Sequence, residues 1–338
     1  MTAVDRQRIL KITSGLAALA GIGGMVSLIA YQGLQDVAQV LVPAGWGILL
    51  ITLFHLVPLT ASALSWKSAH AAIADGTAAV FIWARIVREA VNGLLPVAQV
   101  GGDIVGARIL TFHGSKATAA GASVLVDLTL EFLTQIVFTM IGLGLLLWQG
   151  GGRLASWSAI GLAIAIVLGT AFVMAQRRGL FRLLEILFDR MAGMLNWPAL
   201  GSLDNLHDVV MTIYRDRRAM VAATLWHLAS WLVGAVEVWL TLRILGADVG
   251  FADALVIESL GQAIRTAAFM VPGAFGIQEG GYLLLGVHFG VPPEIALSVS
   301  LVKRVRELAI GIPAMLIWQV IEGRRLLART PVRTDHPS

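Results

Sequence analysis

The sequence predicts an all-α polytopic membrane protein with about six spanning helices, two re-entrant Gly/Pro hairpins and two inverted repeats. Three observations lead to this fold class. First, 57% of the 338 residues are hydrophobic and only 14% are charged, whereas about a quarter of a soluble domain is charged. Second, several apolar runs reach the roughly 20 residues that cross a bilayer as a helix. Third, two Gly/Pro-interrupted stretches repeat one pattern 176 positions apart.

The apolar runs fall into two kinds. Six are long enough to span: 12–31, 44–66, 117–148, 156–175, 219–243 and 294–322. Two others, 77–112 and 252–290, are interrupted by Gly, Pro and several charges. They predict re-entrant hairpins with non-helical tips shielded by protein, because lipid cannot satisfy open backbone groups. The whole chain, 1–338, is expected to be a single membrane domain.

The distribution of Lys and Arg predicts the orientation, because cytoplasmic loops carry an excess of both. With the N-terminus inside, sixteen of them fall on the cytoplasmic side, and Arg153 and Arg243 fall outside. We therefore expect a multi-pass protein of the cytoplasmic (inner) membrane with both termini in the cytoplasm. The amphipathic linker 176–218 is also expected there, either as an interfacial helix or as a solvated helix packed on the bundle.

Composition and motifs exclude several functions. The chain has no cysteine, so disulfides, thiolate nucleophiles and thiolate metal ligands are excluded. The sequence has no Walker loop, no nucleophile elbow and no histidine spacing typical of a metal site. We expect no metal and no cofactor, and we interpret the histidines, including His55 and His227, as structural. The basic residues form no stripe for nucleic acid, and we expect no such partner.

An internal repeat relates the two hairpins and the spans that follow them. The offset of 176 pairs Pro96 with Pro272, Asp103 with Glu279, and Glu131 with Glu307. Repeat 1 covers about 12–148 and repeat 2 about 156–322. The topology makes them antiparallel, so that the first hairpin enters from the cytoplasm and the second from outside. Paired Gly/Pro-interrupted segments in inverted halves indicate a transport site near the bilayer midplane.

Many ionisable residues fall inside the predicted membrane segments. Each costs about 2.5–3.5 kcal/mol at the bilayer centre on insertion scales, so it must pair, face water or serve a function. Two interpretations stay open. One is a set of buried ion pairs, in which Asp103 or Glu131 meets Arg85 or Arg88, and Glu279 or Glu307 meets Arg265 or Arg304. The other is a functional cavity lined by these side chains.

The candidate site residues follow from the cavity interpretation. The candidate substrate-binding residues are Arg88, Asn92, Pro96, Asp103, Arg265, Pro272 and Glu279. The candidate ion- or proton-coupling residues are Asp127, Glu131, Arg304 and Glu307. Arg88 and Arg265 are the first choices for headgroup contacts, because a guanidinium binds phosphate through two parallel hydrogen bonds.

Two stretches resemble a known family. One runs from Arg88 to Asp103, Arg-Glu-Ala-Val-Asn-Gly-Leu-Leu-Pro-Val-Ala-Gln-Val-Gly-Gly-Asp; the other, from Pro272 to Gly280, reads Pro-Gly-Ala-Phe-Gly-Ile-Gln-Glu-Gly. They resemble the lysylphosphatidylglycerol synthase transmembrane-domain family, and within it the hopanoid-biosynthesis-associated membrane proteins, over about 10–325. The resemblance implies a flippase-like domain that moves a headgroup-bearing lipid between leaflets. The chain lacks the soluble aminoacyl-transferase domain of the full synthases, so lipid aminoacylation is not expected.

The leading hypothesis is therefore a lipid flippase or transporter for a polar-headgroup or hopanoid-type lipid. The alternatives are a membrane-embedded enzyme that modifies lipid headgroups and a scaffold of a lipid (hopanoid) biosynthesis complex. The expected partners are a membrane lipid and the bilayer, together with a second copy of the chain or lipid-biosynthesis enzymes.

Overall fold

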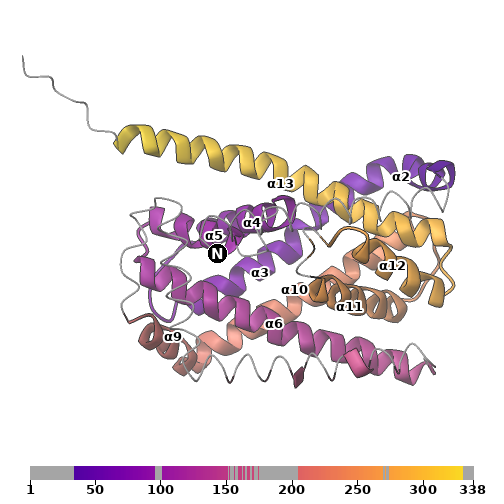
Figure 1. Cartoon of the computed structure of the whole chain (residues 1–338), viewed down its shortest axis with the longest axis horizontal. Coiled ribbons are helices and arrows are strands. Elements are labelled where there is room, and N and C mark those ends of the chain that lie inside the picture. The colour runs from indigo at the N-terminus through magenta and orange to yellow at the C-terminus, as the bar shows by residue number, and fades with distance from the viewer. Residues whose placement is uncertain are drawn as a thin grey trace, which may run out of the picture.

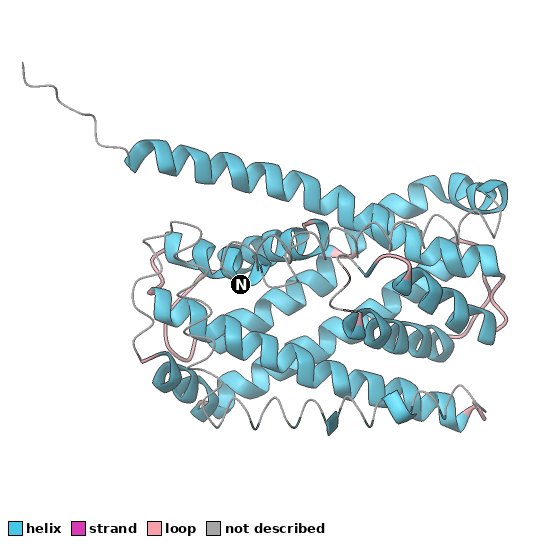
Figure 2. Ribbon diagram, viewed as in Figure 1, coloured by secondary structure: helices cyan, strands magenta, loops and turns pink. Residues whose placement is uncertain are grey.

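In the computed structural model, the described residues are 34–95, 101–150, scattered positions between 152 and 174, and 205–329 except 269, 270, 272 and 273. All regular elements in these ranges are helices, and no strand occurs among them (Figure 2). The predicted all-α class is confirmed for this part of the chain. The predicted span 12–31, most of 156–175, the linker up to residue 204, Pro96 and Pro272 lie outside the described residues.

The predicted span 44–66 lies within two nearly continuous helices, α2 (Leu34–Phe54) and α3 (Leu56–His70). Backbone bonds on both sides of the junction, from His55 N to Ile51 O (3.0 Å) and from Leu59 N to His55 O (3.2 Å), carry the helix across it. Pro58 explains the irregular turn at His55, because proline has no N–H to donate to the carbonyl four residues earlier.

Each predicted hairpin contains two helices within the described residues. The first contains α4 (Ala78–Leu94) and α5 (Gly101–Phe112), and the second contains α11 (Phe251–Ala267) and α12 (Ile277–His288). The remaining described helices are α6 (Ala117–Trp148), α9 (Leu206–Arg215), α10 (Arg217–Ile244) and α13 (Pro293–Arg329). We refer to α2–α6 as the first half and to α9–α13 as the second half.

The two hairpins lie toward opposite ends of the molecule, and the long helices connect them (Figure 1). Helix α6 contacts α5 of its own half and α11 of the other, while α13 contacts α12 and α4. Both crossings are close because of a glycine. A Cβ on Gly142 of α6 would meet Ser259 Oγ of α11 at 1.8 Å, and one on Gly311 of α13 would meet Leu94 Cδ1 of α4 at 2.8 Å. Small residues of this kind let membrane helices approach each other.

Three helices in the described part of the chain are long and apolar enough to cross a membrane: Leu41–His70, Ala117–Trp148 and Arg217–Ile244. They coincide with the predicted spans 44–66, 117–148 and 219–243. Helix α13 covers the predicted span 294–322 but is not one of the three. Four of the five residues from Lys303 to Glu307 are charged, and the uncharged stretch after them ends at Glu322. Membrane helices are thus supported, and the count of six spans stays a prediction.

The long helices expose large apolar side chains on their outer faces. Examples are Trp46 on α2, Met140 and Ile141 on α6, Leu225 on α10 and Leu316 on α13. A soluble monomer rarely exposes a large contiguous apolar surface. This outer surface is suited to contact with lipid, whereas charged side chains such as Asp127 on α6, Glu237 on α10 and Arg306 on α13 are buried.

Candidate functional site

A cavity of about 390 Å³ lies among α3, α4, α6, α10, α11 and α13. The charged side chains that line it are Arg85, Arg88, Glu89, Glu131, Glu237, Glu258, Arg265, Arg306 and Glu307. His55 and His227 also line it, and so do apolar side chains such as Phe132 and Trp231. Residues of both halves line the cavity. Its wall is rich in charged groups, whereas the outer faces of the long helices expose large apolar side chains.

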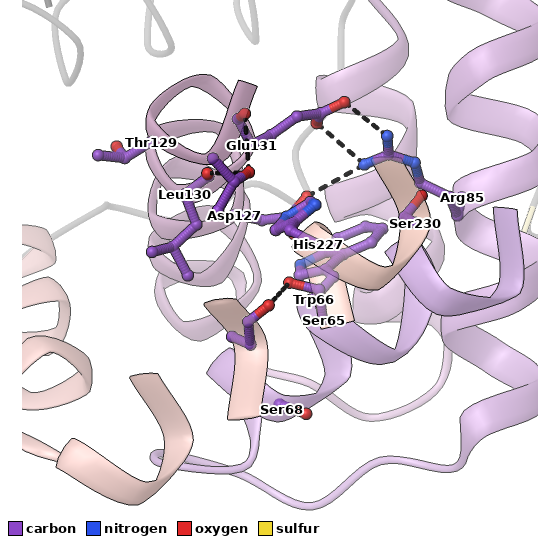
Figure 3. Close-up of polar contacts among 12 residues, drawn as sticks. Ser65, Trp66, Ser68, Arg85, Asp127, Thr129, Leu130, Glu131, His227 and Ser230 are labelled. Atoms are coloured by element: carbon purple, nitrogen blue, oxygen red, sulfur yellow. Dashed lines mark hydrogen bonds and ion pairs between the residues drawn. The ribbon is translucent and has the colours of Figure 1, made fainter. Parts of the chain in front are cut away.

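The first half supplies a group of six charged residues that we call the α4–α6 cluster: Arg85, Arg88, Glu89, Asp103, Asp127 and Glu131. Arg85 and Arg88 lie three residues apart and therefore share one face of α4. Arg85 Nη2 is 2.7 Å from Glu131 Oε1 (Figure 3). Arg85 Nε is 2.8 Å from Glu89 Oε1. The Asp127 carboxylate, fully buried on the next turn of α6 before Glu131, faces the same guanidinium at 3.3 Å.

The guanidinium of Arg88 pairs with carboxylates on both α5 and α6, whereas that of Arg85 pairs with carboxylates on α4 and α6. Its Nε is 2.5 Å from Asp103 of α5, its Nη1 is 2.5 Å from Asp127, and its Nη2 is 3.2 Å from Glu131. The guanidinium also lies 5.6 Å from the centre of the Trp66 ring. Every nitrogen of Arg88 thus faces a carboxylate, which makes it the centre of the cluster.

The second half supplies eight charged residues that we call the α10–α13 cluster: Glu237, Glu258, Arg265, Glu279, Lys303, Arg304, Arg306 and Glu307. Arg304 Nε lies 3.0 Å from Glu279 of α12, and its Nη1 lies 3.0 Å from Glu307. Lys303 Nζ is 2.6 Å from Glu258 of α11 and 2.5 Å from the Tyr282 hydroxyl. Arg306 pairs with Glu237 of α10. As in the first half, an acid at the start of the second hairpin helix holds an arginine.

Two histidines contact carboxylates of the opposite half: His55 of the first half contacts Glu237, and His227 of the second half contacts Asp127. His55, at the α2–α3 junction, has its Nδ1 2.8 Å from Glu237 Oε2 and its Nε2 4.0 Å from Glu89. His227, on α10, has its Nε2 3.0 Å from Asp127 Oδ1 of α6 (Figure 3). Sequence spacing did not indicate these contacts, because Glu237 lies 182 residues from His55 and Asp127 lies 100 residues from His227. The available signal was weaker: both are polar residues inside apolar helices.

The amino-acid sequence was compared with models of known protein families, and one family matches most of the chain. The lysylphosphatidylglycerol synthase TM region matches residues 15–314 of the chain. The chain belongs to the lysylphosphatidylglycerol synthase TM family. This confirms the resemblance seen in the sequence and indicates a membrane lipid-related function, while the hopanoid subgroup stays a prediction. Searches of curated proteins and of solved structures each found no match.

The family match spans both clusters, and the predicted site residues within the described part of the chain divide into two groups. Arg88, Asn92, Glu131, Arg265 and Glu307 line the cavity. Asp103, Asp127, Glu279 and Arg304 are not among the lining residues and form ion pairs with those or neighbouring charges. The ion pairs expected from the sequence and the polar cavity are therefore both present, since the pairs form the cavity wall.

Arg265 differs from Arg88 in how it is held. Its side chain is 26% exposed, against 3% for Arg88. Within the described residues its one ion pair joins Nη1 to Glu307 Oε1 at 2.8 Å. Neighbouring Thr266 accepts a hydrogen bond from Gln135 Nε2 at 2.7 Å, and Gln262 donates to Glu258 at 2.8 Å. This wall combines a guanidinium that has unused donors with amide and hydroxyl groups, which is a suitable surface for an anionic, hydrogen-bonding group.

Proposed function

We propose that this protein is a lipid flippase or transporter that moves a lipid with a polar headgroup across the cytoplasmic membrane. The observation that carries the proposal is the charged cavity, lined by both halves and enclosed by helices with apolar outer faces. A headgroup that crosses roughly 30 Å of hydrocarbon needs a polar path, because the bare charge is costly there. The cavity supplies such a path for the headgroup, while the hydrocarbon tails stay in lipid.

In this proposal Arg265 makes the first contact with the headgroup phosphate, and Arg88 makes the second. Arg265 is accessible and has unused donors, whereas Arg88 must first exchange one of its carboxylate partners. Asn92 lines the same wall and holds the start of α5 by accepting a hydrogen bond from Gly102 N at 2.7 Å. Asp103 and Glu279 orient Arg88 and Arg304, respectively.

We further propose that the two halves are inverted repeats whose hairpins enter from opposite sides of the membrane. The helix bounds support the repeat: α5 begins at Gly101 and α12 at Ile277, 176 positions later, and both have 12 residues. Helices α6 and α13 begin at Ala117 and Pro293, again 176 positions apart. Inverted repeats around a midplane site are the architecture on which alternating access depends.

The substrate class follows from the chemistry of the cavity wall. Exposed guanidinium and amide groups favour a phosphate or another anionic headgroup with hydrogen-bonding substituents, and the apolar side chains of the lining favour the upper part of a lipid tail or a hopanoid-type skeleton. Asp127, Glu131, Arg304 and Glu307 surround this path and are the proposed coupling residues. A headgroup-modifying enzyme is the alternative, with a cavity carboxylate as acid or base.

Purified protein in liposomes tests the proposal with fluorescent NBD-labelled phosphatidylglycerol and dithionite, which quenches only the outer leaflet. Dithionite should quench about half of the probe in empty liposomes and nearly all of it in liposomes with the wild-type protein. Arg243→Gln is the control, because Arg243 pairs with exposed Asp248 away from the cavity. Quenching that stays at the level of empty liposomes for phosphatidylglycerol, aminoacylated and hopanoid probes contradicts transport. Detection of a chemically altered lipid in the same samples by mass spectrometry would favour the alternative, a headgroup-modifying enzyme.

A further inference from the structure

The formal charges of the two clusters do not match. The α10–α13 cluster has four cations and four carboxylates, so it is balanced. The α4–α6 cluster has four carboxylates but only two arginines, so its formal charge is −2. Uncompensated charge is costly in a protein interior, and a cluster of this kind stabilises any cation that reaches it.

A titratable group stands at the position where that positive charge is needed. His227 Nε2 lies 3.0 Å from Asp127 Oδ1, and His227 is only 1% exposed. The other oxygen of Asp127 is occupied by Arg88 Nη1 at 2.5 Å and by Arg85 Nη1 at 3.3 Å. The carboxylate is therefore fixed, and it orients the imidazole with the Nε2 hydrogen directed at Oδ1. Because His227 lines the cavity, water in the cavity can reach the ring.

We infer that His227 and Asp127 form a proton-binding site that couples lipid movement to a proton gradient. This inference rests on the proposed function and adds its energy source. The proton binds to Nδ1 of His227 from water in the cavity, gives an imidazolium, and later leaves from the same nitrogen, with no covalent change. Imidazole is the side chain suited to this, because it exchanges protons near neutral pH.

Other charges from every neighbouring helix surround this pair. They are Arg85, Arg88 and Glu89 on α4, Asp103 on α5, Glu131 on α6, Glu237 on α10, Arg265 on α11, Arg306 and Glu307 on α13, and His55 at the α2–α3 junction. The nearest of them, Arg88, connects the proton to the substrate. A cationic His227 shares the charge of Asp127, which loosens the hold of Asp127 on Arg88 and makes that guanidinium available for phosphate. Proton binding and headgroup binding then favour each other, as linkage requires of two coupled ligands.

Proton binding is measured first without any transport. Protein with ¹⁵N-labelled histidine, reconstituted in nanodiscs, gives ring signals that distinguish neutral from cationic imidazole. One signal that changes from neutral to cationic imidazole when protons are added should be missing in His227→Gln. It should still be present in His70→Gln. His70 is a matched control, because it is equally buried but contacts the hydroxyl of Ser115 instead of a carboxylate. A His227 signal that stays neutral over the whole range overturns the site.

Coupling is then measured as the leaflet distribution of NBD-labelled phosphatidylglycerol under an imposed pH gradient, with the membrane potential clamped. For one proton per lipid, each pH unit should shift the leaflet ratio by about tenfold. His227→Gln and the near-isosteric Asp127→Asn should abolish this shift, and His70→Gln should retain it. If the wild-type protein exchanges the probe but the leaflet ratio does not change with the pH gradient, the coupling is overturned. The proposed lipid transport is not contradicted by that result. A probe that does not exchange at all contradicts the proposed function itself, and the histidine titration then decides the proton site.

Discussion

Arg88 and Arg265 were equivalent candidates in the sequence, and the structure separates them by their surroundings. Arg88 is buried among three carboxylates, whereas Arg265 is partly exposed to the cavity and has one ion pair among the described residues. Stability and substrate binding should therefore depend differently on the two residues. A pair of neutral substitutions separates these roles.

We expect Arg265→Gln to fold normally and to transport poorly. A partly exposed ion pair contributes only about 0–1 kcal/mol to stability, so the midpoint of thermal unfolding in detergent should change little. A charge-assisted hydrogen bond to phosphate contributes about 1.5–3 kcal/mol. The initial rate of NBD-lipid exchange at low probe concentration should thus fall roughly tenfold or more. An unchanged rate would remove Arg265 from the substrate path.

We expect Arg88→Gln to be destabilising as well as inactive. It leaves Asp103, Asp127 and Glu131 without their shared cation, and removing one partner of a buried ion pair costs about 3–5 kcal/mol. The unfolding midpoint should therefore drop well below that of Arg265→Gln under the same conditions. Equal midpoints for the two variants would show that the cluster does not stabilise the fold.

At this scale the sequence predicted the acids and arginines but not their full set of partners. Pairs such as Arg88 with Asp103 and Arg265 with Glu307 followed from the need to neutralise charge in apolar segments. His227 was interpreted as structural because the sequence has no histidine spacing typical of a metal site. Its partner in the structure, Asp127, is 100 residues away in the chain. A motif-based search finds a histidine site only when the spacing is local, and here the crossing of α10 and α6 creates the contact.

At the scale of elements, the first hairpin depends on a close approach of its two helices. A Cβ on Gly102 would lie 2.1 Å from the carbonyl oxygen of Arg88 and 2.7 Å from Asn92 Oδ1. Only glycine permits the start of α5 to pack directly on the end of α4. This packing also sets the 2.5 Å distance between Arg88 Nε and Asp103 Oδ1.

We therefore predict that Gly102→Ala moves α5 away from α4 and lengthens the Arg88–Asp103 pair. Overpacking of this kind costs about 1–3 kcal/mol, so both the unfolding midpoint and lipid exchange should decrease. Gly144→Ala on α6 is the control, because a Cβ there meets nothing within 4 Å. If the two variants behave alike, the close approach at Gly102 is unimportant.

The sequence predicted the element types well because hydrophobic length and breaking residues determine them locally. The hairpins 77–112 and 252–290 are resolved as α4–α5 and α11–α12, with their breaks next to Pro96 and Pro272 in the chain. The junction at His55 was not predicted. It depends on Pro58, which lies inside an otherwise uniform apolar run, where a proline can either bend or end a helix.

At the scale of the whole molecule, the proposed repeat matches helix positions better than it matches charges. Asp127 and Lys303 are 176 positions apart and carry opposite charges. Each pairs with an opposite charge on the first helix of its own hairpin: Asp127 with Arg85 of α4, and Lys303 with Glu258 of α11. The two halves therefore share a layout and differ in charge balance. A cavity formed between halves could not be derived from either half alone, because its wall depends on how they pack.

The central claim is that two oppositely oriented halves enclose one polar path, and cysteine labelling tests it most directly. The chain has no cysteine, so Leu95→Cys and Val271→Cys each introduce a single thiol. These positions are 176 apart, beside the tips of the two hairpins, and both are half-buried. The measurement is the reaction of each thiol with a membrane-impermeant maleimide added to one side of sealed vesicles. We predict that Leu95→Cys reacts from the cytoplasmic side and Val271→Cys from the opposite side; labelling of both from the same side would contradict the account.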